Sequence, residues 1–258
     1  MGEWQLALDE CQKALALEGV ELMDLKSFPG REGERYVLDN KNSEIVFTQG
    51  YSATNTFYNN MAYFCTCTFS GSEDLISLYN RFEGQQIKDL RLDAFFEVIG
   101  DEQYKVSKVG EKVYDCFVIR SAELYLNKAE AEAMLDKAEA IQTIKTLLNN
   151  RFEGGIPPVD GLNGKDLVSF IRDERRRELC FEAHRWFDLR RYAVSPKYPE
   201  KKSIKHTTYD KNGVLEGDYV LKPYGEDPAW VLPIPGYEIV YNQGNLVDNP
   251  QRVERELE

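Results

Sequence analysis

The sequence predicts a mainly helical protein, and three stretches carry that prediction. Residues 164–192 contain no Pro or Gly after Gly164, and their apolar residues recur on one stripe at about 100° per residue. Residues 114–151 show two further helical patterns, and residues 3–18 show a shorter amphipathic one. Helices that each carry an apolar stripe bury it by packing on one another, so we expect helices to form most of the core.

The N-terminal part reads as one helix followed by irregular chain. Gly19 ends the helix predicted over residues 3–18, and the charged, Gly-rich residues 28–42 predict a loop. The short apolar run at 44–47 predicts an extended segment. After an uncharged stretch rich in Tyr, Phe, Asn and Thr, we expect a helix over 73–82 and a strand over 94–99.

The two helices predicted at 114–136 and 137–151 form a pair. The first carries a narrow stripe of small residues that includes Ala122, Ala129 and Ala133, which allows another helix to approach closely. The pair resembles a tetratricopeptide hairpin.

The helix predicted over 164–192 has charges on its apolar stripe. Such charges persist in a core only when they are paired. Spacings of i,i+3 allow Glu182–Arg185, Arg185–Asp188 and Asp188–Arg191 pairs, whereas Glu174 and Glu178 need arginines from other elements. Two alternatives are a solvated charged helix and a catalytic carboxylate pair, although the surrounding arginines do not suit the latter.

The C-terminal region is expected to be open and irregular. Residues 193–227 read as exposed loops with a hairpin around 211–213, and the prolines within 230–235 exclude an interior helix or strand there.

Composition narrows the possible functions. A hydrophobic content of 42% indicates a globular chain, and the net charge of −12 disfavours nucleic acids and anionic lipids. No stretch approaches the length of a membrane span. The five cysteines lack metal-ligand spacing and are expected to be free buried thiols, with a disulfide as the alternative.

No sequence pattern for catalysis is present. The chain contains no phosphate loop, no Gly-x-Ser-x-Gly elbow and no His-x-x-x-His pair, so we expect no enzyme, no metal and no cofactor. His184, one of the two histidines, is expected to be structural. A glycoside hydrolase that uses paired acids is an alternative.

Several strings resemble the SusD/RagB family of outer-membrane glycan-binding lipoproteins. The densest runs from Glu174 to Arg191 and includes Phe-Glu-x-His-Arg-Trp-Phe-Asp-Leu; Ala183 stands where the family most often has Gly. Further matches are Asn42–Phe47, Asp89-Leu-Arg91, Arg120–Ala131, Leu148–Arg151 and the closing Leu-Pro-Ile-Pro segment. The resemblance marks a structural signature set: Arg120, Glu123, Glu130, Glu174, Glu178, Glu182, Arg185, Trp186 and Asp188.

This resemblance implies a SusD-like helical fold with tetratricopeptide-like hairpins, long loops and a few short strands. We expect residues 1–258 to be one C-terminal region: a loop-rich ligand-facing segment at 42–110, a helical core at 114–192, and closing loops at 193–250. The implied function is non-catalytic oligosaccharide binding at the outer cell surface, with delivery to a SusC-like TonB-dependent transporter. Family members carry a lipid anchor, and we expect that anchor to lie outside this chain.

The candidate ligand site lies in the uncharged stretch. Sugars offer apolar faces for aromatic stacking and hydroxyls for amide hydrogen bonds, and one segment supplies both side-chain types: Tyr51, Asn55, Phe57, Tyr58, Asn59 and Tyr63. Core packing of these residues is the alternative, and it would leave the chain as a helical-repeat scaffold without a glycan ligand.

Overall fold

The computed structural model describes residues 2–30, 36–39, 41–49, 70–82, 84, 86–99, 103–108, 117–210, 212, 214–250 and 257. The chain divides into two compact units. The large unit comprises Glu3–Arg185, and the small unit comprises Trp186–Glu258 together with the first two residues. The prediction of a mainly helical fold with a few short strands is confirmed.

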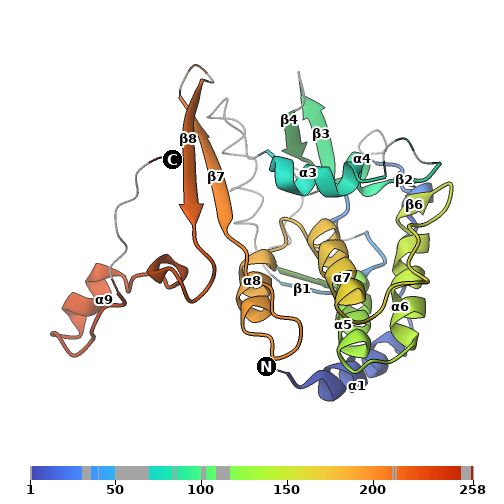
Figure 1. Ribbon diagram of the computed structural model, residues 1–258, viewed down its shortest axis with the longest axis horizontal. Helices are drawn as coiled ribbons and strands as arrows, with labels where there is room; N and C mark the ends of the chain where they lie inside the picture. The colour runs from blue at the N-terminus through green and yellow to red at the C-terminus, as the bar shows by residue number, and fades with distance from the viewer. Residues whose placement is uncertain are drawn as a thin grey trace. The chain divides into compact units, whose positions relative to one another are not determined.

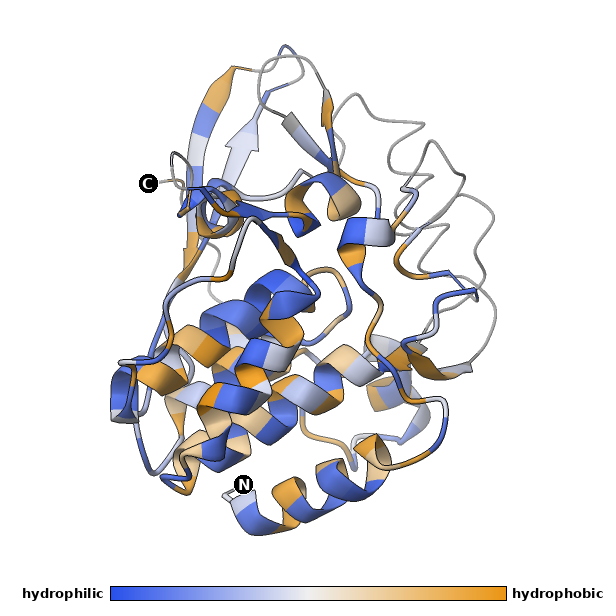
Figure 2. Ribbon diagram, turned by 90° about the vertical axis from the view of Figure 1, so that its right-hand side faces the viewer, coloured by the Kyte–Doolittle hydropathy of each residue, from blue (hydrophilic) through white to orange (hydrophobic). Residues whose placement is uncertain are grey.

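Four helices form the body of the large unit (Figure 1): α1 (Trp4–Leu15), α5 (Ser121–Met134), α6 (Glu139–Asn149) and α7 (Gly164–Glu178). Helix α5 lies at the centre and packs against the other three. The stripe residues Ala122, Ala129 and Ala133 are buried, as predicted, and their small side chains let the neighbouring helices approach closely. Hydrophobic and hydrophilic residues recur on successive turns of α1, as expected of an amphipathic helix (Figure 2).

Short elements form a second part of the large unit. They are η1 (Leu25–Ser27), β1 (Ile45–Gln49), α3 (Glu73–Asn80), β2 (Lys88–Asp89), α4 (Arg91–Phe95), β3 (Phe96–Ile99), β4 (Gln103–Val106), β5 (Phe117–Arg120) and β6 (Phe152–Glu153). The strands pair antiparallel as β1–β5, β2–β6 and β3–β4. Side chains of α3, α4 and β3 form one apolar cluster, which includes Val37, Leu75, Tyr79, Phe95 and Phe96.

Two predicted boundaries are wrong. The helix expected from residue 114 begins only at Ser121, because Phe117–Arg120 is extended and pairs with β1. Residues 94 and 95 belong to helix α4 instead of a strand, and β3 begins at Phe96. In both places a short strand adjoins a helix, and the apolar run alone does not show where one gives way to the other.

The continuous helix predicted over 164–192 is also wrong. Helix α7 ends at Glu178, and α8 (Arg185–Ala193) begins seven residues later. In the turn between them, Phe181 and Ala183 have φ values of 62° and 64°, in the left-handed region that favours glycine. The preference of the family for Gly at the position of Ala183 therefore reflects backbone conformation as well as small size.

The small unit contains α8, a β-hairpin and closing turns. Strands β7 (Ile204–Tyr209) and β8 (Leu215–Leu221) pair antiparallel around residue 212, which confirms the predicted hairpin. The 3₁₀ turn η3 (Pro228–Trp230) and helix α9 (Gly236–Tyr241) follow. The rings of Trp186 and Trp230 lie 4.4 Å apart and join α8 to η3, and Tyr224 contacts Trp230 edge-on.

Candidate functional site

The predicted ligand residues Tyr51, Asn55, Phe57, Tyr58, Asn59 and Tyr63 lie outside the residues that the structure describes. The chain on either side of them is fixed by strand pairing. Before the segment, β1 pairs with β5 up to the Gln49–Phe117 pair. After it, Ser70 forms a β-bridge with Lys105, and the Gly71 amide donates to the Tyr104 carbonyl at 2.7 Å. What anchors β1 and β5 therefore bears directly on the candidate site.

A buried group of charges anchors these strands, and we call it the ion cluster. Five acids and five basic residues compose it, so its formal charge is zero: Glu44, Asp89, Glu174, Glu178 and Glu182 with Arg91, Lys108, Arg120, Arg151 and Arg177. Every one of these side chains is at most 3% exposed. The members come from six separate stretches of the chain.

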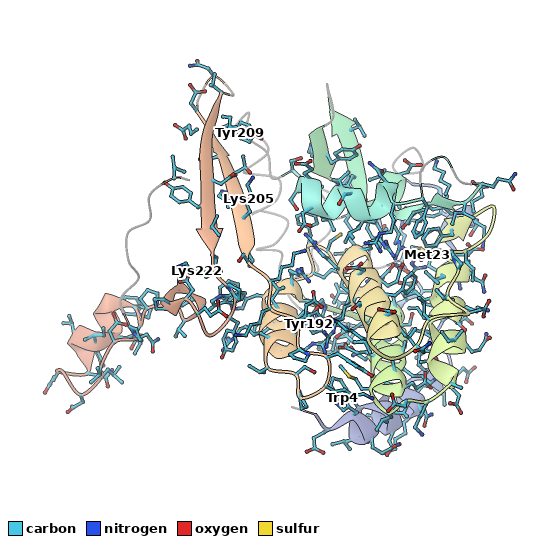
Figure 3. The ribbon with its side chains drawn as sticks, in the orientation of Figure 1. Trp4, Met23, Tyr192, Lys205, Tyr209 and Lys222 are labelled. Atoms are coloured by element: carbon cyan, nitrogen blue, oxygen red, sulfur yellow. The ribbon has the colours of Figure 1, made fainter. Side chains whose placement is uncertain are left out.

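Glu178, at the end of α7, lies at the centre of the ion cluster. One carboxylate oxygen accepts from Arg120 Nη1 at 2.6 Å, and the other accepts from Arg151 Nε at 2.9 Å. Glu44 bridges the same two arginines, at 2.8 Å from Arg120 Nη1 and 2.5 Å from Arg151 Nη2. The backbone of Met23 (Figure 3) completes the site, because its amide donates to Glu44 and its carbonyl accepts from Arg151.

Arg91 connects the ion cluster to helix α4. Asp89 binds it with both oxygens, at 2.8 Å from Nε and 2.7 Å from Nη2. Its Nη1 donates to Glu174 at 2.9 Å and lies 3.3 Å from Glu178. Arg177 pairs with Glu174 on α7 and donates to the Leu78 carbonyl at 2.8 Å. Planar guanidinium groups suit such two-oxygen contacts, which explains why arginine predominates in the cluster.

Two buried cations explain why α7 ends at Glu178. Lys108 Nζ donates to the carbonyls of Glu178 and Cys180 at 2.6 and 3.2 Å, and Arg120 Nη2 donates to the Glu178 carbonyl at 2.7 Å. The last carbonyls of a helix lack partners within the helix and attract positive charge. Glu182, in the turn, accepts from Lys108 and binds Arg120 with both oxygens at 2.8 Å. These contacts hold the left-handed turn in place.

The surrounding cations keep Glu178 and Glu182 ionised. Burial alone would raise the pKa of Glu178, but Arg151, Arg120 and Arg91 outweigh it and hold that pKa well below its ordinary value. The pKa of Glu182 is likewise lowered, because Arg120 and Lys108 outweigh its burial. A general acid in a glycosidase needs the opposite shift, so neither carboxylate suits that role.

The other signature residues have structural contacts of their own. Arg175 Nη2 lies 3.6 Å from Glu123, and Arg172 Nε lies 3.4 Å from Glu130, so both acids connect α5 to α7. Further along the chain, Asp188 accepts from Arg191 at 2.8 Å, as the i,i+3 spacing predicts. Arg185 and Trp186 begin α8 and are half-buried. His184 lies in the turn, with its ring nitrogens 3.4 Å from Arg175 and 3.8 Å from Glu123.

The charges on the apolar stripe predict that Glu174 and Glu178 are buried and paired, but they do not identify the partners. Both acids were expected to need arginines from other elements, and the structure supplies Arg91, Arg120 and Arg151. Arg177, which also pairs with Glu174, comes from α7 itself. A signal for several partners was present, because Glu44, Asp89–Arg91 and Arg151 each lie within a string that resembles the family. Lys108 lies in no such string, and only the structure identifies it.

Possible metal ligands and free thiols were the other candidates for a chemical site in the described residues. Those residues contain no group of three or more His, Cys, Asp or Glu side chains that could hold a metal ion. Cys11 and Cys180 are free and buried, and burial raises the pKa of Cys11 to about 11, which makes its thiol unreactive. None of the helices in the described part of the chain is long and apolar enough to cross a bilayer. The fold and the ion cluster together define a mainly helical scaffold that is held by buried ion pairs.

The comparisons with known proteins identify the family of this scaffold. The SusD family model matches residues 96–251, and the chain belongs to the SusD family, a family of non-catalytic binding proteins. Two SusD-like proteins of Formosa agariphila are similar: P38 is 35% identical over 115 residues, and P2 is 28% identical over 147. These matches cover 41% and 51% of this chain but only 21% and 25% of the two relatives.

Solved structures of the family share the fold. A SusD superfamily protein from Bacteroides thetaiotaomicron aligns with a TM-score of 0.68 at 21% identity, over 97% of this chain and 57% of its own. A SusD-like carbohydrate binding protein from Bacteroides vulgatus aligns with a TM-score of 0.61 at 19% identity, over 94% of this chain and 55% of its own. This chain therefore spans little more than half the length of these structures.

Proposed function

We propose that this chain is part of a surface protein that binds an oligosaccharide without catalysis and delivers it to a SusC-like TonB-dependent transporter. Its membership of the SusD family carries the proposal. The similarity to a SusD-like carbohydrate binding protein supports a sugar as the ligand class. The corresponding location is the outer face of the outer membrane, with attachment through a lipid anchor.

Within this proposal, Tyr51, Asn55, Phe57, Tyr58, Asn59 and Tyr63 contact the sugar. Aromatic rings stack on sugar faces, and amides bond the hydroxyls. The place of these residues in the chain supports this role, because they follow strand β1. Strand β1 pairs with β5, and the Glu44–Arg120 contact of the ion cluster stabilises that pairing. A binding loop on a rigid support loses less conformational freedom when it binds.

Titration calorimetry against a glycan panel tests the proposal. Tyr51→Ala and Tyr58→Ala should each weaken binding by about 1–3 kcal/mol, because each removes a stacking ring. Tyr209→Ala is the matched control: Tyr209 is exposed on β7 (Figure 3), and its loss should leave the affinity unchanged. Binding that survives both loop variants would place the site elsewhere, and release of sugar products would contradict a non-catalytic role.

A further inference from the structure

The segment after η3 exposes apolar side chains to an unusual degree. Tyr237, Val240 and Tyr241 of α9 are 72%, 79% and 86% exposed, and α9 has no buried residue. Leu232 and Val247, which flank the helix, are also exposed. Single exposed apolar residues are ordinary, but several within one short segment indicate a surface that another surface covers.

This segment is nevertheless folded, and polar contacts hold it. The Ile234 amide donates to Asp248 at 2.8 Å, and the Asn249 side chain donates to the Leu232 carbonyl at 2.7 Å. These bonds tie the two ends of residues 231–249 together, and we call this segment the C-terminal loop. Hydrogen bonds to its backbone, and not burial of its own apolar side chains, hold the C-terminal loop in shape. The loop is therefore preorganised and would lose little conformational freedom when it docks.

The composition of the C-terminal loop indicates what kind of surface covers it. Between residues 231 and 247, Glu238 is the one charged residue. Depletion of charge with enrichment in Tyr, Val and Leu is typical of the centre of a permanent interface, whereas transient interfaces are more polar. The covering surface is therefore apolar and permanently in contact.

The length of the relatives indicates where that surface comes from. The family model extends to residue 251, so the C-terminal loop belongs to the shared family fold. This chain spans 55%, 57% and 62% of three solved relatives, which therefore contain much polypeptide without a counterpart here. We propose that the C-terminal loop docks through α9 on the part of a longer SusD-family protein that lies outside these 258 residues. This inference does not depend on the identity of the sugar.

The test compares this chain with the product of the longer reading frame that contains it. Val240→Asp places a charge on the exposed face of α9. In the longer protein it should lower the melting temperature by at least about 4 °C, and in the 258-residue chain by no more than about 1 °C. Val214→Asp, at an exposed valine in the β7–β8 turn, is the matched control and should have no effect in either protein. Amides of α9 should exchange at least tenfold more slowly in the longer protein.

Four results would overturn the proposal. Equal destabilisation of both proteins by Val240→Asp would mean that the C-terminal loop is covered within this chain. A dimer of the 258-residue chain that Val240→Asp dissociates in sedimentation would mean that a second copy covers it. The absence of a longer reading frame, or a longer protein that Val240→Asp leaves unchanged, would mean that no further part of the chain docks there.

Discussion

The two units of the chain contain very different shares of its apolar side chains. Of 33 buried apolar residues in the described part of the chain, 29 belong to the large unit and 4 to the small unit. Of 20 large apolar side chains that are exposed there, 14 belong to the small unit and 6 to the large one. The large unit also encloses the ion cluster, whereas the Lys201–Glu226 ion pair of the small unit is solvent-exposed.

This difference shows that the two units derive their stability from different sources. The large unit has its own apolar core, and its buried charges pair with one another. Substitutions of these buried residues should therefore lower its stability strongly. The small unit buries little and relies on backbone bonds and a few stacked rings, so most substitutions on its surface should have little effect in this chain.

Replacement of Glu178 should have the largest effect. Glu178→Gln removes the charge shared by Arg91, Arg120 and Arg151 and should lower the free energy of unfolding by about 3–5 kcal/mol. Urea denaturation measures this loss. The matched control is Glu139→Gln, at an exposed acid in the first turn of α6, which should cost less than about 1 kcal/mol. Equal losses would show that the ion cluster does not stabilise the large unit.

Acid should weaken the large unit through the same carboxylates. The pKa values of Glu178 and Glu182 in the folded protein lie below their ordinary value of 4.5. At a pH between the folded pKa values and 4.5, the unfolded chain therefore binds more protons than the folded protein. Their contribution is fully present above that value and is lost as the pH falls through the folded pKa values. Melting temperatures should therefore change little from pH 8 to pH 6 and fall below pH 4.5. Glu178→Gln should make the acid-side decrease shallower, and an unchanged slope would contradict this assignment.

Two matched valines compare the units directly. Val168 on α7 is 1% exposed, and Val240 on α9 is 79% exposed. Val168→Ala should cost roughly 1–3 kcal/mol because it leaves a cavity, whereas Val240→Ala should change the stability of this chain by less than about 0.5 kcal/mol. Both variants delete the same atoms from a helix, so chemical denaturation reports the difference in burial. Similar losses would remove the contrast between the units.

The turn after α7 should show a small gain. Ala183 has a φ of 64°, so Ala183→Gly should stabilise the protein by about 0.5–1 kcal/mol by relieving that conformation. Ala16 is the control, because it is exposed and has a φ of −86° at the end of α1. Ala16→Gly should be neutral or destabilising in the same thermal melts, and a gain there equal to that at Ala183 would rule out the left-handed turn as the cause.

Local patterns in the sequence predicted much of the fold. Helices α1, α3 and α6 and the β7–β8 hairpin follow from apolar spacing and turn residues, which act over short distances along the chain. The end of α7 could not be predicted in this way. Lys108 and Arg120, which lie 70 and 58 residues away in the sequence, donate to the Glu178 carbonyl at the end of this helix. No pattern within the helix predicts that contact.

The candidate site shows the same division. The charges on the apolar stripe of α7 indicated that Glu174 and Glu178 are buried and paired, but a stripe does not show which arginines pair with them. Family resemblance marked Glu44, Arg91 and Arg151 as members of separate strings, and folding brings these strings together around Glu178. The ligand role of residues 51–63 rests on composition and stays a prediction.

The most direct test of the ion cluster is a double-mutant cycle between Glu178 and Arg151, whose side chains are 2.9 Å apart. Unfolding free energies would be measured for Glu178→Gln, Arg151→Met and the double variant. If the two residues stabilise the large unit as a buried pair, their coupling energy should be at least about 1.5 kcal/mol, with the double variant less destabilised than the sum of the single variants. Additive losses, with a coupling energy near zero, would contradict the account.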